Sequence, residues 1–149
     1  MNSKQEAVGK LLETGPFPVL HAVVSMLQEK VNGDYDALKT KSTCSREFIS
    51  WLESLESMAD KELLFRGFEK LASTVPRRDH RDLALGYYRV GEMIVEVGLE
   101  GLNKCGQLLR LTGGRPPRVY AKIYSGELEI AVIRAGEEEV KEQASLYIM

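Results

Sequence analysis

The stretch Leu83–Leu111, LALGYYRVGEMIVEVGLEGLNKCGQLLRL, decides which fold the sequence predicts, because it is the longest single element that we expect. Its apolar residues recur at the spacing of an α-helix on two sides. One side carries Leu83, Tyr87, Val90, Ile94 and Val97, and the other carries Tyr88, Val95, Leu99 and Leu102. A helix that is apolar on two sides is normally central and buried. We therefore expect a central helix with Asp79 as its N-cap. Because each internal glycine costs about 1 kcal/mol relative to alanine, a break near Gly98–Gly101 stays open.

Shorter helices are expected upstream of this element. They cover residues 3–13, Pro18 to about Val31, 34–38, Ser45 to Met58, and 60–75. The sequence Asn32-Gly33-Asp34 is expected to end one helix, and Asp34 to cap the next. Ser45 is a plausible N-cap for its helix. One long helix over residues 45–75 is the alternative to two, because no proline interrupts this segment and Gly67 is its only glycine.

The segment Arg118–Gly136, RVYAKIYSGELEIAVIRAG, alternates in the manner of a β-hairpin. A two-residue turn at Ser125-Gly126 would place Tyr124 opposite Glu127 and Lys122 opposite Glu129. In this register one face is apolar and consists of Val119, Ala121, Ile123, Leu128, Ile130 and Val132. A loop of three to five residues would shift the register. Residues 137–149 are expected to form a helix, because three glutamates suit a helix N-terminus, and a third strand is the alternative.

These elements predict a mainly α (α+β) fold in a single domain, residues 1–149. About six helices would form a helical bundle over 3–111, followed by a two-stranded antiparallel hairpin over 118–134 and a short C-terminal helix or third strand over 137–149. The helix count is compatible with adaptor bundles such as the death fold, but no motif is shared.

Composition is ordinary for a globular protein and excludes several classes. Hydrophobic residues make up 44% and charged residues 28% of the 149 residues, unlike a disordered chain. The net charge of −2 argues against general nucleic-acid binding, although a local basic patch remains open. Two cysteines without metal spacing favour a reducing compartment. Since neither a signal peptide nor a membrane-spanning run is evident, we expect a soluble cytoplasmic protein.

No pattern in the sequence indicates a catalytic, metal or cofactor site, and we expect a protein that is not an enzyme. His21 lies among apolar residues, and His80 lies in a charged run. Catalysis by histidine needs a positioned partner, and nothing in the sequence places Cys44 or a serine beside either histidine as a nucleophile. The glutamates of the expected helices lack an accompanying Glu-x-x-His and are interpreted as a solvated face.

Two arginine clusters are candidate binding sites for an anion, a nucleic acid or an acidic partner. The clusters consist of Arg77, Arg78, His80 and Arg81, and of Arg110, Arg115 and Arg118. Cations at a helix N-terminus interact unfavourably with the helix dipole, so an anion site is one interpretation of the first cluster. A salt-bridged surface turn is the structural alternative. On one straight helix over 79–111 the clusters would lie about 50 Å apart, so a shared patch would require a fold-back or a second subunit.

The predicted hairpin is a candidate interface, because strand edges that carry few charges can pair with another chain. Its candidate residues are Tyr120, Lys122, Tyr124, Glu129, Ile130 and Ala131. We therefore expect a non-enzymatic protein-interaction or regulatory module that forms a homodimer or binds another protein through the hairpin. The alternative is an RNA-binding regulatory protein that uses the arginines at 77–81 and 110–118, with tyrosines available for stacking.

Overall fold

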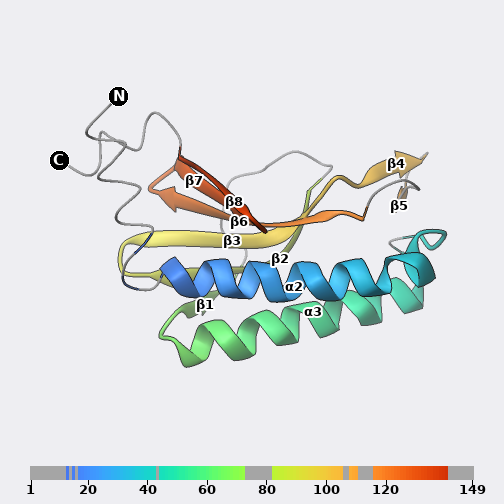
Figure 1. Cartoon of the computed structure of the whole chain (residues 1–149), viewed down its shortest axis with the longest axis horizontal. Coiled ribbons are helices and arrows are strands. Elements are labelled where there is room, and N and C mark those ends of the chain that lie inside the picture. The colour runs from blue at the N-terminus through green and yellow to red at the C-terminus, as the bar shows by residue number, and fades with distance from the viewer. Residues whose placement is uncertain are drawn as a thin grey trace.

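Two helices cover one face of an antiparallel sheet in the computed structural model of the chain (Figure 1). The structure describes residues 13, 15, 17–42, 44–72, 82–105, 108–110 and 116–140, and for 103–105, 108–110 and 138–140 it describes the backbone alone. The main sheet has six strands in the order β1-β2-β3-β6-β7-β8, and β4 and β5 form a separate pair. The predicted helical bundle over 3–111 is therefore wrong. The predicted helix at 3–13 lies outside the described residues apart from Glu13.

Helix α2, Phe17–Leu38, is one continuous helix that buries Leu20, Val24 and Leu27 against the sheet. The predicted break at Asn32-Gly33-Asp34 is wrong. The Asp34 carboxylate accepts hydrogen bonds from Lys30 Nζ and from Trp51 Nε1, both at 2.9 Å, instead of capping a new helix. A tertiary contact to the neighbouring helix thus overrides the local tendency of these residues to end a helix.

Helix α3, Arg46–Phe65, begins at the predicted N-cap, since Ser45 Oγ accepts a hydrogen bond from the Phe48 backbone N–H at 3.2 Å. The helix continues without a break past Met58, as the one-helix alternative predicted, but it ends well before residue 75, because Gly67 adopts φ of 90° and reverses the chain. The predicted helix over 60–75 is therefore helical only to Phe65, and strand β1, Glu69–Leu71, follows. Phe68, between them, is buried in the core.

The predicted central helix is in fact an antiparallel pair of strands, β2 (Leu83–Val90) and β3 (Met93–Glu100). Gly91, with φ of 60°, forms the turn between them. The residues are β-branched or aromatic at many positions, which favours strands. The two apolar stripes that suggested a helix arise because both faces of these strands are buried. After β3 the chain forms the short strands β4 (Asn103–Cys105) and β5 (Leu108–Arg110).

The strands predicted at 118–134 are present as β6 (Arg118–Ser125) and β7 (Leu128–Arg134), within the larger sheet. The predicted register is wrong, because the turn is formed by Gly126 and Glu127 and pairs Ser125 with Leu128. Gly126 adopts φ of 63° at the first turn position, where type II′ turns place glycine. An irregularity beside Ile123 then adds a further shift, so that Lys122 lies opposite Val132.

Strand β8, Glu137–Val140, pairs with β7 along its free side. The predicted helix over 137–149 is therefore wrong for its first four residues, and the remainder lies outside the described residues. Among the described residues, no helix combines the length and the apolar character needed to cross a membrane.

Candidate interaction surface between the two helices

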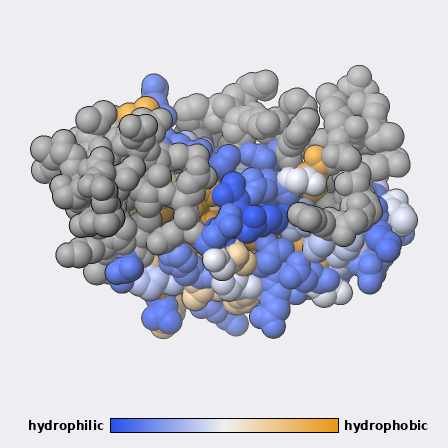
Figure 2. Space-filling model, turned by 45° about the horizontal axis from the view of Figure 1, so that its top comes forward, coloured by the Kyte–Doolittle hydropathy of each residue, from blue (hydrophilic) through white to orange (hydrophobic). Residues whose placement is uncertain are grey.

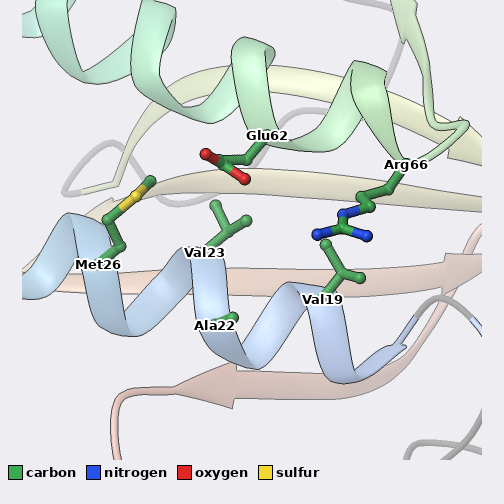
Figure 3. Close-up of a pocket in the computed structure, with 6 residues that line it drawn as sticks. All are labelled: Val19, Ala22, Val23, Met26, Glu62 and Arg66. Carbon is green, nitrogen blue, oxygen red and sulfur yellow. The ribbon is translucent and has the colours of Figure 1, made fainter.

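A groove runs between the beginning of α2 and the end of α3, on the side of the helices that faces away from the sheet (Figure 3). Its volume is about 200 Å³. Helix α2 contributes four residues spaced i, i+3, i+4 and i+7, which are Val19, Ala22, Val23 and Met26. Helix α3 contributes Glu62 and Arg66 to the opposite wall. The groove is thus an apolar strip with one carboxylate and one guanidinium beside it.

The groove exists because the apolar surface of α2 is wider than the sheet can cover. Leu20, Val24 and Leu27 have no exposed surface and face the sheet. Val19 and Met26 are only half-buried, and Ala22 is exposed. Val19 and Met26 thus pack against the hydrophobic core and leave part of their apolar surface at the groove.

Phe65 at the end of α3 is the most exposed large hydrophobic residue described in the chain, with 80% of its surface accessible. The Arg66 guanidinium lies 5.3 Å from the centre of its ring, a cation–π contact. At 3.6 residues per turn, Phe65 lies about 60° around the helix from Glu62, whereas Leu64 lies about 160° away. Phe65 therefore lies beside the groove residues Glu62 and Arg66 without lining the groove itself, and Leu64 belongs to the other side of α3.

A buried polar network occupies the sheet face opposite the helices, and it involves three of the predicted interface residues. The Glu96 carboxylate, fully buried, accepts hydrogen bonds from Tyr120 Oη and, at 3.4 Å, from Tyr124 Oη. Lys122 Nζ lies 3.0 Å from Asp82 Oδ2 and 4.9 Å from the centre of the Tyr120 ring. This network links β3, β6 and the start of β2, and a satisfied buried network of this kind fixes strand register.

The remaining predicted interface residues, Glu129, Ile130 and Ala131, lie on β7. Ile130 and Ala131 are buried, and β7 is hydrogen-bonded to β6 on one side and to β8 on the other. Glu129 is half-buried opposite Tyr124. Strand β8 thus covers the edge of β7 at Ala131–Arg134, and Glu129 and Ile130 lie beyond the described pairing.

Of the predicted arginine clusters, the structure describes only Arg118 with its side chain. Arg118 is exposed, and its guanidinium lies 3.3 Å from a Glu137 carboxylate oxygen. Arg110 lies in β5, where the structure describes the backbone alone. Arg77, Arg78, His80, Arg81 and Arg115 lie outside the described residues.

Other titratable groups join the helices to each other and to the sheet. Tyr88 Oη donates to Asp60, and Lys70 Nζ lies 2.6 Å from the other Asp60 oxygen and 2.9 Å from Glu56. Burial, followed by the hydrogen bond to Asp60, raises the pKa of Tyr88. The hydrogen bonds to Asp60 and Glu56 raise the pKa of Lys70. Tyr88 is therefore neutral and Lys70 charged at physiological pH, and their contacts with Asp60 attach α3 to β1 and β2.

Candidates for catalysis and metal binding were also located where the structure describes them. His21 is half-buried on α2, and Cys44 is an exposed free thiol. No group of three or more histidine, cysteine, aspartate or glutamate side chains within the described ranges could hold a metal ion. Figure 2 shows a mostly hydrophilic surface on the described part of its view, with small and separate hydrophobic areas. The apolar groove of Figure 3 is therefore the stronger candidate for a protein contact.

Comparison of the chain with models of protein families, with curated proteins and with solved structures gives no match. The candidate site consequently depends on its own geometry. Sequence reasoning missed it because α2 and α3 were expected to bury their apolar stripes in a bundle. One signal was available, since Phe65 lies off the stripe of Leu64, Phe68 and Leu71 that predicted a helix there.

Proposed function

We propose that this protein is a non-enzymatic interaction module of the cytoplasm that binds a protein partner through the groove between α2 and α3. The observation that carries the proposal is the apolar strip of α2 beside Phe65, which is 80% exposed. Large side chains that are left in water next to a groove are typical of interaction sites, because covering them is favourable by roughly 25 cal/mol per Å². The exposed free thiol of Cys44 is compatible with a reducing compartment.

The groove defines the chemistry of the partner. Its floor of Val19, Ala22 and Met26 accepts a bulky apolar side chain. Glu62 and Arg66 lie one helical turn apart on the wall, so they favour a partner that carries a basic and an acidic group at the same spacing. An amphipathic helix meets both requirements, because it displays an apolar residue and two flanking charges on one face.

A groove-blocking variant tests the proposal. Ala22→Arg places a long cation in the groove at an exposed helix position, and Ala37→Arg makes the same change at an exposed position about 22 Å further along α2. Amphipathic peptides selected from a displayed library against the wild-type chain should bind Ala22→Arg at least about 10-fold more weakly, as expected for loss of a central apolar contact. They should bind Ala37→Arg with unchanged affinity. Peptides that bind both variants equally well would contradict the proposed site.

RNA binding is a second candidate function, and one observation favours it. Leu83 pairs with Leu99, and Glu100 pairs with Arg118. The segments that contain the two arginine clusters therefore join the sheet at the same end, on strands whose attachment points are about 10 Å apart. The separation of about 50 Å that a straight helix would impose does not apply to this fold. Tyr120, fully buried, is not available for base stacking.

Salt dependence separates RNA binding from protein binding. If the arginines contact phosphates, affinity for a single-stranded RNA should fall steeply with salt, and the salt slope should drop by about one unit for each charge removed. Arg78→Gln and Arg118→Gln test the two segments separately. An affinity that is indifferent to salt and to both substitutions would eliminate this candidate.

A further inference from the structure

We propose that the partner in the groove is a second copy of this chain, joined through α3 in a symmetric dimer. This inference rests on the proposed function of the groove, and it goes further by naming the occupant. In the dimer, Phe65 of each copy enters the groove of the other, and Glu62 of each copy pairs with Arg66 of the other.

Charge complementarity is the first argument. Glu62 and Arg66 are four residues apart on the same wall of the groove. A twofold axis that sets two α3 helices antiparallel reverses the order of these residues in the second copy. Each Glu62 then faces an Arg66, and each Arg66 faces a Glu62, so that two ion pairs form at once. An opposite-charge pair along a helix is therefore complementary to itself under twofold symmetry, which is the commonest symmetry of protein dimers.

The match between Phe65 and the groove is the second argument. The groove has a volume of about 200 Å³, and cavities of about 150 Å³ lined by apolar side chains bind benzene. The volume of this open groove is therefore large enough for a phenyl ring. Phe65 does not line the groove of its own chain, but its ring lies 5.3 Å from the guanidinium of Arg66, which does. In the dimer, the Phe65 ring of the second copy enters this groove, and its apolar surface is thereby removed from water.

The position of the groove relative to the sheet is the third argument. Glu62 lies in the last turn of α3 and Arg66 is its C-cap, immediately before the turn at Gly67. The surface that a second copy must approach is thus at one end of the helix layer. It is formed entirely by described residues of α2 and α3, and it is separate from the strand edges that the sequence suggested as an interface.

A charge-exchange experiment tests the dimer. Wild-type protein should show a concentration-dependent mass between monomer and dimer in analytical ultracentrifugation. Glu62→Arg places like charges opposite each other, and so does Arg66→Glu, so each variant alone should be monomeric. When the two variants are mixed, every contact becomes Arg–Glu, and a heterodimer should form. The double variant with both exchanges should dimerise again.

The mixing step protects the test from a trivial loss of folding, because a misfolded variant would not regain association with its counterpart. Phe65→Ala should raise the dissociation constant by about 30-fold or more, as for a buried aromatic contact at the centre of an interface. Two controls lie on the other side of α3. Glu53→Arg makes the same charge change as Glu62→Arg, and Leu64→Ala truncates a large apolar side chain as Phe65→Ala does. Both should dimerise as the wild type does.

Two results would overturn the dimer. One is a wild-type mass that stays monomeric at every concentration measured, and the other is a mixture of Glu62→Arg and Arg66→Glu that fails to form a heterodimer while wild type dimerises. Neither result would by itself remove the proposed function, because peptides that bind wild type but not Ala22→Arg would still locate a protein contact in the groove. Conversely, a dimer insensitive to Phe65→Ala and to Ala22→Arg would exclude the groove as the contact.

Discussion

Replacing Gly98 with alanine should destabilise this fold far more than the addition of one methyl group suggests. A Cβ atom at position 98 would lie 2.5 Å from Tyr120 Oη, 2.7 Å from Tyr120 Cζ and 2.7 Å from the Leu83 carbonyl oxygen. Gly98 and Tyr120 are paired across β3 and β6, and the tyrosine ring lies over the glycine. The Leu83 oxygen belongs to the backbone, so it cannot move aside without displacing β2. The substitution therefore forces a movement of both a strand and a buried ring.

The size of the effect follows from two contributions. Overpacking a well-packed interior costs about 1–3 kcal/mol. A displaced Tyr120 also loses its hydrogen bond to the fully buried carboxylate of Glu96, and an unsatisfied buried partner costs roughly 1–3 kcal/mol more. We expect the free energy of unfolding to fall by about 3 kcal/mol, a large part of the 5–15 kcal/mol typical of a domain. The midpoint temperature should fall by roughly 10 °C.

Urea denaturation followed by circular dichroism measures this change, and two other glycines provide matched controls. At Gly33, on the exposed face of α2, an added Cβ meets nothing within 4 Å, so alanine should stabilise the protein by about 0.5–1 kcal/mol. At Gly86 the nearest atom is the Tyr88 hydroxyl oxygen at 3.1 Å, which belongs to a side chain, so the effect should be smaller than at Gly98. If Gly98→Ala stayed within about 0.5 kcal/mol of wild type, the proposed approach of Tyr120 and β2 would be refuted.

Three further predictions follow from single contacts. Gln28 accepts a hydrogen bond from the Val119 backbone N–H at 2.7 Å. Gln28→Ala should therefore destabilise the protein by about 1–3 kcal/mol and speed hydrogen exchange at the Val119 amide. An unchanged exchange rate at this amide would contradict the role of Gln28. Ser45→Ala should remove about 1 kcal/mol through loss of the N-cap, and Ser45→Asp should restore it in denaturant titrations. The hydrogen bond from Lys30 lowers the pKa of Asp34, so its contribution to stability is complete above the ordinary carboxyl pKa and is lost as pH falls below about 4. Asp34→Asn should therefore show a smaller loss of midpoint temperature on acidification than wild type, and an equal loss would count against this pairing.

The sequence predicted some elements correctly because their signals are local. Ser45 caps α3 as expected, since an N-cap needs only its own turn of helix. The strands β6 and β7 were predicted from alternation along the chain. Their register was not, because it depends on which residues form the turn and on an irregularity beside Ile123 that alternation does not reveal.

The segment 83–100 was misinterpreted for a physical reason. Strands covered on both faces lose the simple alternation that identifies a strand, and their apolar residues can then match helical spacing by chance. Here Val95, Val97 and Leu99 are buried towards the helices, while Tyr87 and Glu96 are buried on the other face. Aromatic and β-branched residues were the better indicators, and the turn glycine Gly91 marked the boundary.

The candidate site was beyond sequence reasoning because it joins residues about forty positions apart, and only the packing of α2 on α3 brings Met26 near Glu62. The sequence suggested a strand-edge interface instead, and the sheet gives a physical reason to prefer the helices. One edge strand, β8, begins with three consecutive glutamates, and charges at a sheet edge oppose pairing with another chain. The other edge strand, β1, is only three residues long and offers few backbone groups for pairing. With the two edge strands of the main sheet protected by charge and by shortness, an apolar contact with another protein is favoured where apolar surface is still exposed, at the end of α3 and along the outer stripe of α2.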